Sequence, residues 1–375
     1  MSGDPGRPMR VVIAPDSFKG TLEAAAAADA LAAGWRSRRP ADELVMLPLA
    51  DGGEGTLDAL GHDLPASCWR SAVVSGPDGR PVQADWLLLP DGTAVVEMAR
   101  AAGLPLLERP DPLGATTRGL GEVLAAAVAD PAVHRVMLTL GGSATTDGGT
   151  GALAALGARF TDAGGAELPP GGGALARLAR VDLSGLTPPP PGGVQCLVDV
   201  TAPLLGPLGA AGQFGPQKGA SPAQAAELEA ALARLAGLLG GDPEAPGAGA
   251  AGGTAFGFAA CWGAEFVSGA DAVAAAAGLA EALSGADLVV TGEGQFDAQS
   301  LRGKVVGALV GRAAAAGVPV TVVAGRVVAD GDLPVARALA LTDLAGSAAA
   351  AMTEPARWLA EAGERLAGEA DSLSG

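Results

Sequence analysis

The chain has 375 residues, a formal net charge of −17 and 49% hydrophobic residues, with a mean hydropathy of +0.32. This length predicts two domains, or one large domain with insertions. The strong negative charge argues against nucleic acid and against an anionic membrane surface as partners. Cys68, Cys196 and Cys261 are scattered and odd in number, which argues against a disulfide framework or a zinc site.

No stretch of the sequence approaches about 18 apolar residues without glycine or charge, so we expect no membrane span. The first ten residues, MSGDPGRPMR, lack the apolar segment of a signal peptide. We therefore predict a cytoplasmic protein. The sequence leaves the oligomeric state open, with a homodimer as one option.

Two strand–loop–helix units open the chain. Apolar runs at residues 10–15 and 44–49 predict strands, and helices are expected over residues 21–38, capped by Thr21, and from residue 56. Successive units of this kind favour a parallel sheet, in which ligands bind beyond the carboxyl ends of the strands. We therefore expect the polar residues of the two loops to lie together. They are Asp16, Ser17 and Lys19 in the first loop, and Asp51, Gly52, Gly53 and Glu54 in the second.

The pattern changes in the middle of the chain. Three strand-like runs separated by Gly, Pro and Asp turns, at residues 67–74, 82–89 and 93–98, predict an antiparallel meander. Farther on, residues 287–290 predict a strand that runs into a glycine-rich loop, and α/β alternation continues to the C-terminus. We therefore predict an α/β fold with two domains. These are a Rossmann-like doubly wound domain, residues 1–66 plus 285–375, and an inserted α/β domain, residues 67–284.

Residues 136–160 combine a predicted buried strand, a glycine-rich loop and a helix. The loop contains Gly141, Gly142, Ser143, Thr145 and Asp147. Exposed backbone N–H groups and a helix N-terminus can hold an anion, glycine allows close approach, and hydroxyl groups add donors. The alternative is a tight strand-to-helix turn in which Asp147 caps the helix.

Lysine is rare in this sequence. Among the 24 basic residues only Lys19, Lys218 and Lys304 are lysine, and each adjoins a glycine. On a chain of net charge −17, an anionic ligand requires locally concentrated positive charge. A compact ammonium beside a glycine suits that task, although coincidence in a glycine-rich chain is the alternative.

The other familiar motifs are weak. Gly303-Lys304 lacks the remainder of a phosphate-binding P-loop, and a loose GxGxxA at residues 149–154 falls within a helix-forming segment. His62 and His134 lie outside the glycine loops, which argues against a Ser-His-Asp triad. Carboxylates, lysines and glycine amides at strand ends are the parts that phosphoryl transfer needs.

The sequence resembles the bacterial glycerate kinase family. The blocks that carry the resemblance occur in the order IAPDSFKGTL, PLADGGEGTLDAL, ATTRGLGEVL, LGGSATTDGGTGALAALGARF, DVTAPLLG, FGPQKGA and TGEGQFDAQSLRGK. They cover roughly residues 10–368. The resemblance implies phosphorylation of D-glycerate with ATP and Mg²⁺, to 2-phosphoglycerate rather than 3-phosphoglycerate. It also implies a Rossmann-like α/β domain and an inserted α/β domain with a cleft between them, and a place in the glyoxylate and glycerate metabolism of organic acids.

The resemblance also implies site residues. Three sets are predicted, and Asp51 and Glu293 belong to two of them. The catalytic set is Lys19, Asp51, Asp147, Lys218, Glu293 and Asp297. The substrate- and phosphate-binding set is Asp16, Ser17, Gly52, Gly53, Glu54, Gly141, Gly142, Ser143, Thr145, Gly292, Gly294 and Lys304. The metal set is Asp199, Asp51 and Glu293.

Several alternatives stay open. Asp147 and Asp297 compete for the role of the carboxylate that orients and deprotonates the attacking hydroxyl, and each could instead cap a helix or tie down a loop. Ala202 and Gln295 stand where the family often has Asn and Arg, which puts the choice among small hydroxy acids in question. A different Rossmann enzyme, such as a dehydrogenase, and a non-catalytic two-domain solute-binding protein are the rival interpretations.

Overall fold

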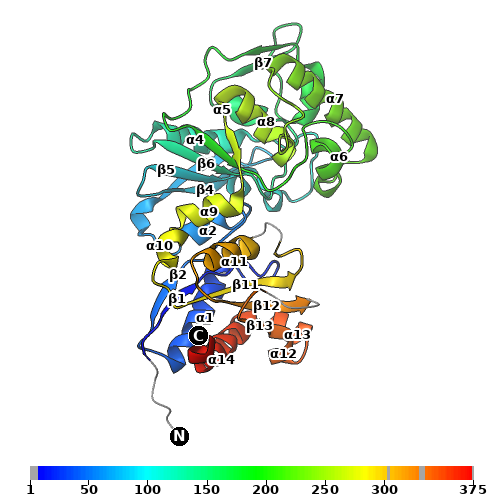
Figure 1. The fold of residues 1–375 in the computed structure, drawn as a ribbon. Helices are drawn as coiled ribbons and strands as arrows, with labels where there is room; N and C mark the ends of the chain where they lie inside the picture. The colour runs from blue at the N-terminus through cyan, green and yellow to red at the C-terminus, as the bar shows by residue number, and fades with distance from the viewer. Residues whose placement is uncertain (1–6, 302–304, 329–333, 374–375) are drawn as a thin grey trace. The chain divides into compact units, whose positions relative to one another are not determined.

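The structure is a computed structural model that describes residues 7–301, 305–328 and 334–373. The chain forms two compact units (Figure 1). The first unit consists of Met1–Asp51, Asp58–Leu64 and Ala270–Gly375, and the second of Gly52–Leu57 and Pro65–Gly269. Strands and helices alternate in both, so the predicted α/β class is confirmed. Within the described residues, no helix combines the length and the apolar character that crossing a bilayer requires.

The first unit is built on a five-stranded sheet in which every neighbouring pair is parallel. Numbered along the chain, its strands follow the order 2-1-3-4-5, which is one of the two common orders of doubly wound sheets. The strands, in spatial order, are β2 (Glu43–Met46), β1 (Arg10–Ile13), β11 (Leu288–Asp297), β12 (Val320–Val328) and β13 (Arg337–Ala340).

Helices cover both faces of this sheet because consecutive strand residues point to opposite sides. Val11 and Ile13 pack with α1 (Ala24–Arg38) and α14 (Pro355–Leu373), whereas Val12 packs into a second core with residues of α9, α10 and α11. The remaining helices are α2 (Thr56–Gly61), α9 (Gly269–Ala276), α10 (Leu279–Leu283), α11 (Val305–Ala315), α12 (Leu341–Ala345) and α13 (Ala348–Thr353).

The second unit contains a mixed six-stranded sheet in the order β10-β9-β6-β5-β4-β3. The predicted meander is confirmed, since β3 and β4 pair antiparallel, as do β4 and β5. The other pairs are parallel, so β5, β6 and β9 end at the same edge. The strands are β3 (Trp69–Ser75), β4 (Pro81–Leu88), β5 (Thr93–Glu97), β6 (Arg135–Thr139), β9 (Val194–Leu197) and β10 (Glu265–Val267), with a separate hairpin of β7 (Arg159–Thr161) and β8 (Arg180–Asp182).

Helices of the second unit connect these strands and share its apolar core. The helices are α3 (Met98–Ala102), α4 (Arg118–Ala129), α5 (Thr150–Ala155), α6 (Ala210–Phe214), α7 (Pro222–Leu239) and α8 (Ala250–Trp262). Short helices follow three of the strands: α3 follows β5, α5 follows β6 and α6 follows β9.

Local predictions met different outcomes. Ser221 caps α7 as expected, with Gln224 completing a capping box. The prediction for Thr21 is wrong: α1 starts at Ala24, and the Thr21 hydroxyl donates to the main-chain oxygen of Phe18 instead. The loop predicted after residue 290 is also wrong, since β11 runs on to Asp297 because its backbone continues to pair with β12.

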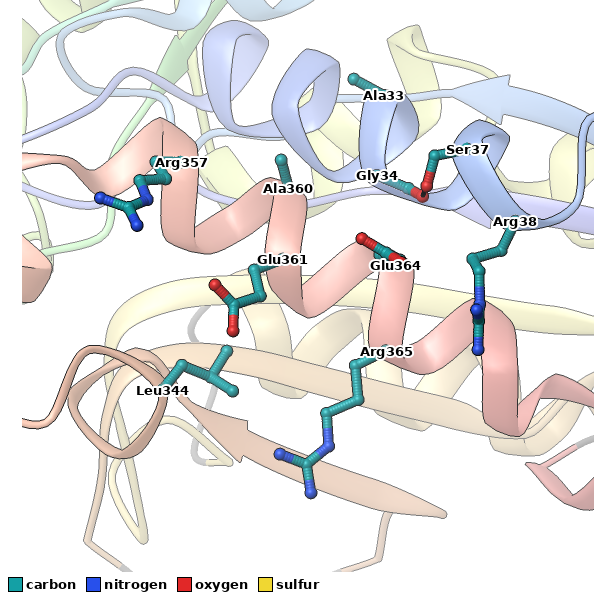
Figure 2. A pocket seen from close by; sticks show the side chains of 10 residues that line it. All are labelled: Ala33, Gly34, Ser37, Arg38, Leu344, Arg357, Ala360, Glu361, Glu364 and Arg365. Carbon is teal, nitrogen blue, oxygen red and sulfur yellow. Dashed lines mark hydrogen bonds between the residues drawn. The ribbon is translucent and has the colours of Figure 1, made fainter.

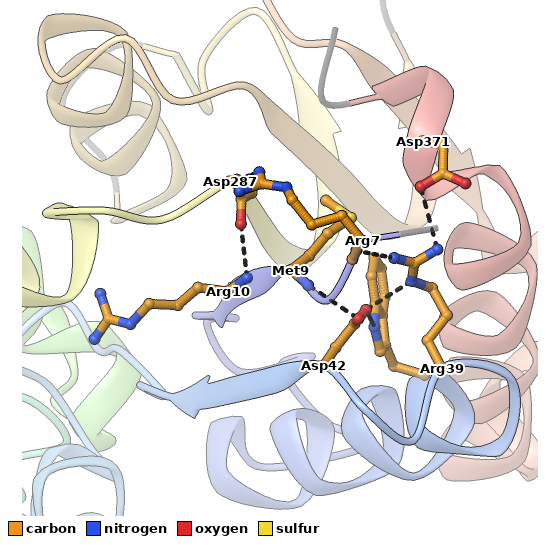
Figure 3. A network of polar contacts seen from close by, with 8 residues as sticks. Arg7, Met9, Arg10, Arg39, Asp42, Asp287 and Asp371 are labelled. Carbon is orange, nitrogen blue, oxygen red and sulfur yellow. Dashed lines mark hydrogen bonds and ion pairs between the residues drawn. The ribbon is translucent and has the colours of Figure 1, made fainter. Parts of the chain in front are cut away.

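The first unit is tied together by a buried carboxylate at the start of β2. Asp42 accepts hydrogen bonds from Nε1 of Trp35, Nε of Arg39 and the backbone N–H of Met9 (Figure 3). Arg39 also pairs with Asp371 near the end of α14. The network thereby joins segments from both ends of the chain to one edge of the parallel sheet.

Small residues let α1 and α14 approach each other closely. A Cβ atom on Gly34 would lie 1.8 Å from the main-chain oxygen of Ala360, and one on Gly363 would lie 2.2 Å from that of Leu31. A groove of about 630 Å³ lies beside this crossing and is lined by Arg38 and Arg365 among others (Figure 2). The helix pair therefore depends on glycine at its contact points.

Candidate active site

The first unit gathers acidic side chains at the carboxyl ends of its central strands. Asp16 follows β1, and its backbone N–H donates to the main-chain oxygen of Gly292 in β11 at 2.8 Å. The ammonium of Lys19 lies 3.3 Å from the Asp51 carboxylate, and the Lys19 side chain is largely exposed whereas that of Asp51 is about half-buried. Glu293 is buried in β11 and is close enough to Asp16 to influence its charge. The structure thus brings together these four predicted residues.

The charged residues of this group shift one another's pKa values. Burial raises the pKa of Asp16 to about 7, a hydrogen bond from the backbone N–H of Ser17 opposes the rise, and Asp51 and Glu293 add to it. The pKa of Lys19 is raised, chiefly by the negative charge of Asp51. Carboxylates crowded in this way favour a bound cation, because the cation relieves both their repulsion and their desolvation.

These residues could supply one or two carboxylate ligands for Mg²⁺. In the part of the chain that the structure describes, no three His, Cys, Asp or Glu side chains converge as a complete metal cage. Mg²⁺ does not require one, since it is commonly held by one or two carboxylates together with water and substrate phosphates. The acidic group around Asp16 and Asp51 meets that requirement. Asp199 belongs to the second unit, where its carboxylate accepts the backbone N–H of Gly269 at 2.9 Å.

Other predicted residues of the first unit lie along β11. Gly292 leaves no room for a side chain, because a Cβ atom there would lie 2.3 Å from the main-chain oxygen of Val323, and Gly294 lies two residues farther on. Asp297 accepts the backbone N–H groups of Gln299 and Ser300. It therefore ties the turn that follows β11. Lys304 lies outside the described residues.

Two glycine loops meet in the second unit. A Cβ atom on Gly141, directly after Leu140, would lie 2.4 Å from the Cα atom of Gly53. Gly52 and Gly142 have φ angles of +83° and +71°, a region that favours glycine. Glu54 follows with an exposed side chain. The structure therefore brings together two glycine-rich segments that the sequence assigns to different domains.

Lys218 holds the longer of these loops from within. Its side chain is 2% exposed, and its ammonium donates to Oγ of Ser143 at 2.9 Å and to the main-chain oxygen of Thr145 at 2.6 Å. Burial lowers the pKa of Lys218 to about 8, although the nearby Asp147 carboxylate opposes that shift. Within the described residues, the buried hydroxyl of Thr145 has no hydrogen-bond partner. A loop of this composition suits an anion, whose oxygens could accept from that hydroxyl and from loop N–H groups.

Asp147 is fully buried and serves the loops around it. Its carboxylate accepts the backbone N–H and the hydroxyl of Thr117, both at 2.9 Å, and the backbone N–H groups of Gly149 and Gly151. Burial raises its pKa and these hydrogen bonds oppose the rise. The N-cap position of α5 is Gly149, whereas the sequence left Asp147 open as the cap. The Asp147 carboxylate instead joins the starts of α4 and α5 through these hydrogen bonds.

Sequence reasoning missed Glu97 at the end of β5. Its side chain is 1% exposed, and its two carboxylate oxygens accept the backbone N–H groups of Gly55 at 3.1 Å and Leu57 at 3.0 Å. One feature of the sequence could have indicated Glu97: it is a charged residue at the end of an apolar strand, Thr93–Glu97. A charged side chain that is buried there needs hydrogen-bond partners.

The structure shows the contacts of Ala202 and Gln295, the two residues that differ from the resembling family. Ala202 is 5% exposed, and its main-chain oxygen accepts the N–H groups of Gly247 and Gly249, so this position contributes to loop packing. Gln295 is exposed, and its side chain donates to the Asp297 carboxylate at 2.9 Å.

Comparisons with known proteins identify the family of the chain. The model of the glycerate kinase family matches residues 11–370. The chain is 43% identical over 309 residues to the glycerate 2-kinase of Escherichia coli, covering 79% of this chain and 80% of that protein, and 40% identical over 331 residues to the glycerate kinase of Bacillus subtilis, covering 86% of each. A crystal structure from Salmonella typhimurium LT2, assigned as glycerate kinase 2, superposes with a TM-score of 0.83 at 36% identity and covers 98% of this chain and 99% of that one. The chain therefore belongs to the glycerate kinase family and is a kinase.

Proposed function

We propose that the protein transfers the γ-phosphoryl group of ATP to a hydroxyl of D-glycerate, with Mg²⁺ bound. The observation that carries the proposal is the family match over residues 11–370. The relative from Escherichia coli is a glycerate 2-kinase, which supports 2-phosphoglycerate as the product. In the reaction the hydroxyl oxygen bonds to the γ-phosphorus, the bond to the bridging oxygen breaks, ADP leaves and the hydroxyl proton is released.

The loops of the second unit are our candidates for phosphate binding. The backbone N–H groups of Gly141 and Gly142, with the hydroxyls of Ser143 and Thr145, supply donors without a large side chain in the way. Lys218 gives this region a positive charge, although its buried ammonium is engaged by Ser143 and Thr145. We therefore assign Lys218 to shaping the loop and to long-range attraction of the anion.

The acidic group of the first unit is our candidate for metal binding. Asp51 and Glu293 would hold Mg²⁺, with Asp16 beside them. Asp199 belongs to the second unit, and its role as a metal ligand stays a prediction. Bound Mg²⁺ would neutralise charge on the phosphate oxygens and orient them. Lys19 is exposed and attached to a flexible stem, so it can reach an anionic substrate while Asp51 keeps it charged.

We assign Asp147 and Asp297 to anchoring loops. The hydrogen bonds that Asp147 accepts on both carboxylate oxygens, together with its burial, support this assignment over a role in taking the hydroxyl proton. Phosphoryl transfer passes through a loose transition state in which positioning and charge matter more than proton removal. The cytoplasmic location, the Rossmann-like description and the two-domain division at residues 66 and 284 stay predictions.

ADP release measures the proposed reaction directly. We expect Mg²⁺-dependent ADP production that requires D-glycerate, and a phosphorus–proton correlation spectrum that places the phosphate on the secondary carbon. Equal ATP hydrolysis with and without D-glycerate, or undiminished turnover in excess EDTA, would contradict the proposal. A phosphate on the primary carbon would still support a kinase reaction, but the product would then be 3-phosphoglycerate.

A further inference from the structure

Glu97 is a buried carboxylate that accepts two backbone N–H groups of a loop segment. Its Oε1 and Oε2 atoms accept the N–H groups of Gly55 and Leu57, so one side chain binds two donors two residues apart. Arg100, one turn along on α3, lies 3.9 Å from Oε1 and supplies a compensating charge. A buried charge needs such partners, because without them its desolvation would be costly.

The segment that Glu97 holds cannot fix its own shape. Gly52 and Gly55 both have positive φ angles, +83° and +86°, and glycine loses more conformational freedom on ordering than any other residue. The N–H groups at the start of α2 also lack partners within that helix. Hydrogen bonds to a charged acceptor satisfy them and define the path of the Gly52–Leu57 segment.

The position of this segment sets that of the second glycine loop. Gly141 packs against the backbone of Gly53 so closely that a Cβ atom there would lie 2.4 Å from the Gly53 Cα atom and 3.1 Å from the nitrogen of Glu54. Any shift of the Gly52–Leu57 segment therefore changes the space available to Gly141 and to the loop that continues to Ser143.

We propose that Glu97 is a positioning residue of the kinase: its negative charge holds the Gly52–Leu57 segment and, through the Gly53–Gly141 contact, aligns both glycine loops for substrate. The inference rests on the proposed function, because it assumes that these loops bind a substrate of the phosphoryl transfer. Glu97 is buried, and its role is to act through the backbone of Gly53 and Glu54.

The test replaces Glu97 with its neutral isostere. Glu97→Gln keeps the volume but removes the charge and places an NH₂ group against one of two backbone donors. We expect faster amide hydrogen exchange at Gly55 and Leu57, a raised KM and a kcat/KM lower by about tenfold to a hundredfold, because small misplacements of binding groups carry costs of that order. Glu97→Asp keeps the charge on a shorter side chain and should recover part of the loss.

Glu122→Gln is the matched control. Glu122 also accepts a backbone N–H, that of Ser75 at 2.7 Å, and pairs with an arginine on its own helix, Arg118, and neither partner belongs to a glycine loop. We expect this variant to retain wild-type kcat and KM. A Glu97→Gln enzyme with unchanged KM, whose activity falls only in proportion to its unfolded fraction, would overturn the inference. A wild-type enzyme inactive on D-glycerate would instead overturn the proposed function, while the exchange rates at Gly55 and Leu57 would still report whether Glu97 holds the segment.

Discussion

The ammonium of Lys218 lies 2.6 Å from the main-chain oxygen of Thr145, in a position where the lysine side chain is almost completely buried. Ser143 and Thr145 occupy two of the three N–H donors of this ammonium, so at most one donor is left for a ligand. We therefore expect Lys218 to act on an anion mainly through the shape of the loop and through its charge, which acts more strongly in a region of low dielectric.

Replacing Lys218 with Met should remove that charge at similar volume. We expect kcat to fall by about a hundredfold, on the order of 3 kcal/mol, and KM for the substrate bound by this loop to rise. Lys218→Arg should restore little, because a planar guanidinium does not fit a site shaped for a compact ammonium. Arg234→Met is the control, since Arg234 also donates to a main-chain oxygen, that of Leu178, but from the exposed side of α7. Normal kinetics in Lys218→Met would contradict this role.

The same lysine predicts a pH dependence of stability. Burial lowers its pKa to about 8 in the folded protein, against an ordinary value of 10.5 in the unfolded chain. The cost of keeping the buried ammonium charged is thus fully present below about pH 8, and it is relieved as the pH rises toward 10.5, where the unfolded chain binds more protons. Between pH 7 and 9.5 the free energy of unfolding of the wild type should therefore rise relative to that of Lys218→Met by about 2 kcal/mol. Parallel curves for the two proteins in urea unfolding would show that the group does not titrate in this range.

Lys19 offers the contrasting case of an exposed ammonium. If it contacts substrate charge, Lys19→Ala should raise KM and lower kcat while leaving the melting temperature within about a degree, since an exposed ion pair contributes at most about 1 kcal/mol to stability. Arg312→Ala is the control: Arg312 forms an exposed ion pair with Asp271 in the same unit, at 2.6 Å, but on α11. We expect steady-state kinetics of the control to match the wild type. Equal kcat and KM values in the two variants would show that Lys19 does not contact the substrate.

The sequence predicted the loops of the site better than the state of the side chains in them. Glycine clusters after apolar runs located the segments around Gly52 and Gly141, because few other residues permit positive φ angles and close backbone contact. The burial of Lys218 and Asp147 could not be predicted from the sequence, because it depends on how loops distant in sequence pack together. The resemblance implies that both residues take part in the reaction, and that role stays a prediction.

Backbone pairing explains the misassigned strand. Residues 291–297 contain two glycines and several polar side chains, which favour a loop by composition. In the sheet they pair in register with β12, with Glu293 opposite Ala324, and this tertiary pairing outweighs local preference. Glu97 was overlooked for a related reason: one charge at the end of an apolar strand carries no motif, and its partners at Gly55 and Leu57 lie 42 and 40 residues away.

The crossing of α1 and α14 gives a prediction about stability alone. Gly34→Ala would bring a methyl group to within 1.8 Å of the main-chain oxygen of Ala360, and backbone atoms cannot yield as the end of a flexible side chain does (Figure 2). The helices must separate, so we expect a loss of about 1–3 kcal/mol in the free energy of unfolding, partly offset by the better helix propensity of alanine.

Gly311→Ala is the matched control, because it lies within α11 of the same unit and nothing stands within 4 Å of its added Cβ atom. That variant should be neutral or more stable by up to about 1 kcal/mol. Chemical denaturation of both variants distinguishes close packing from helix propensity: if Gly34→Ala were as stable as Gly311→Ala, the two helices would not be held at the distance that the structure describes.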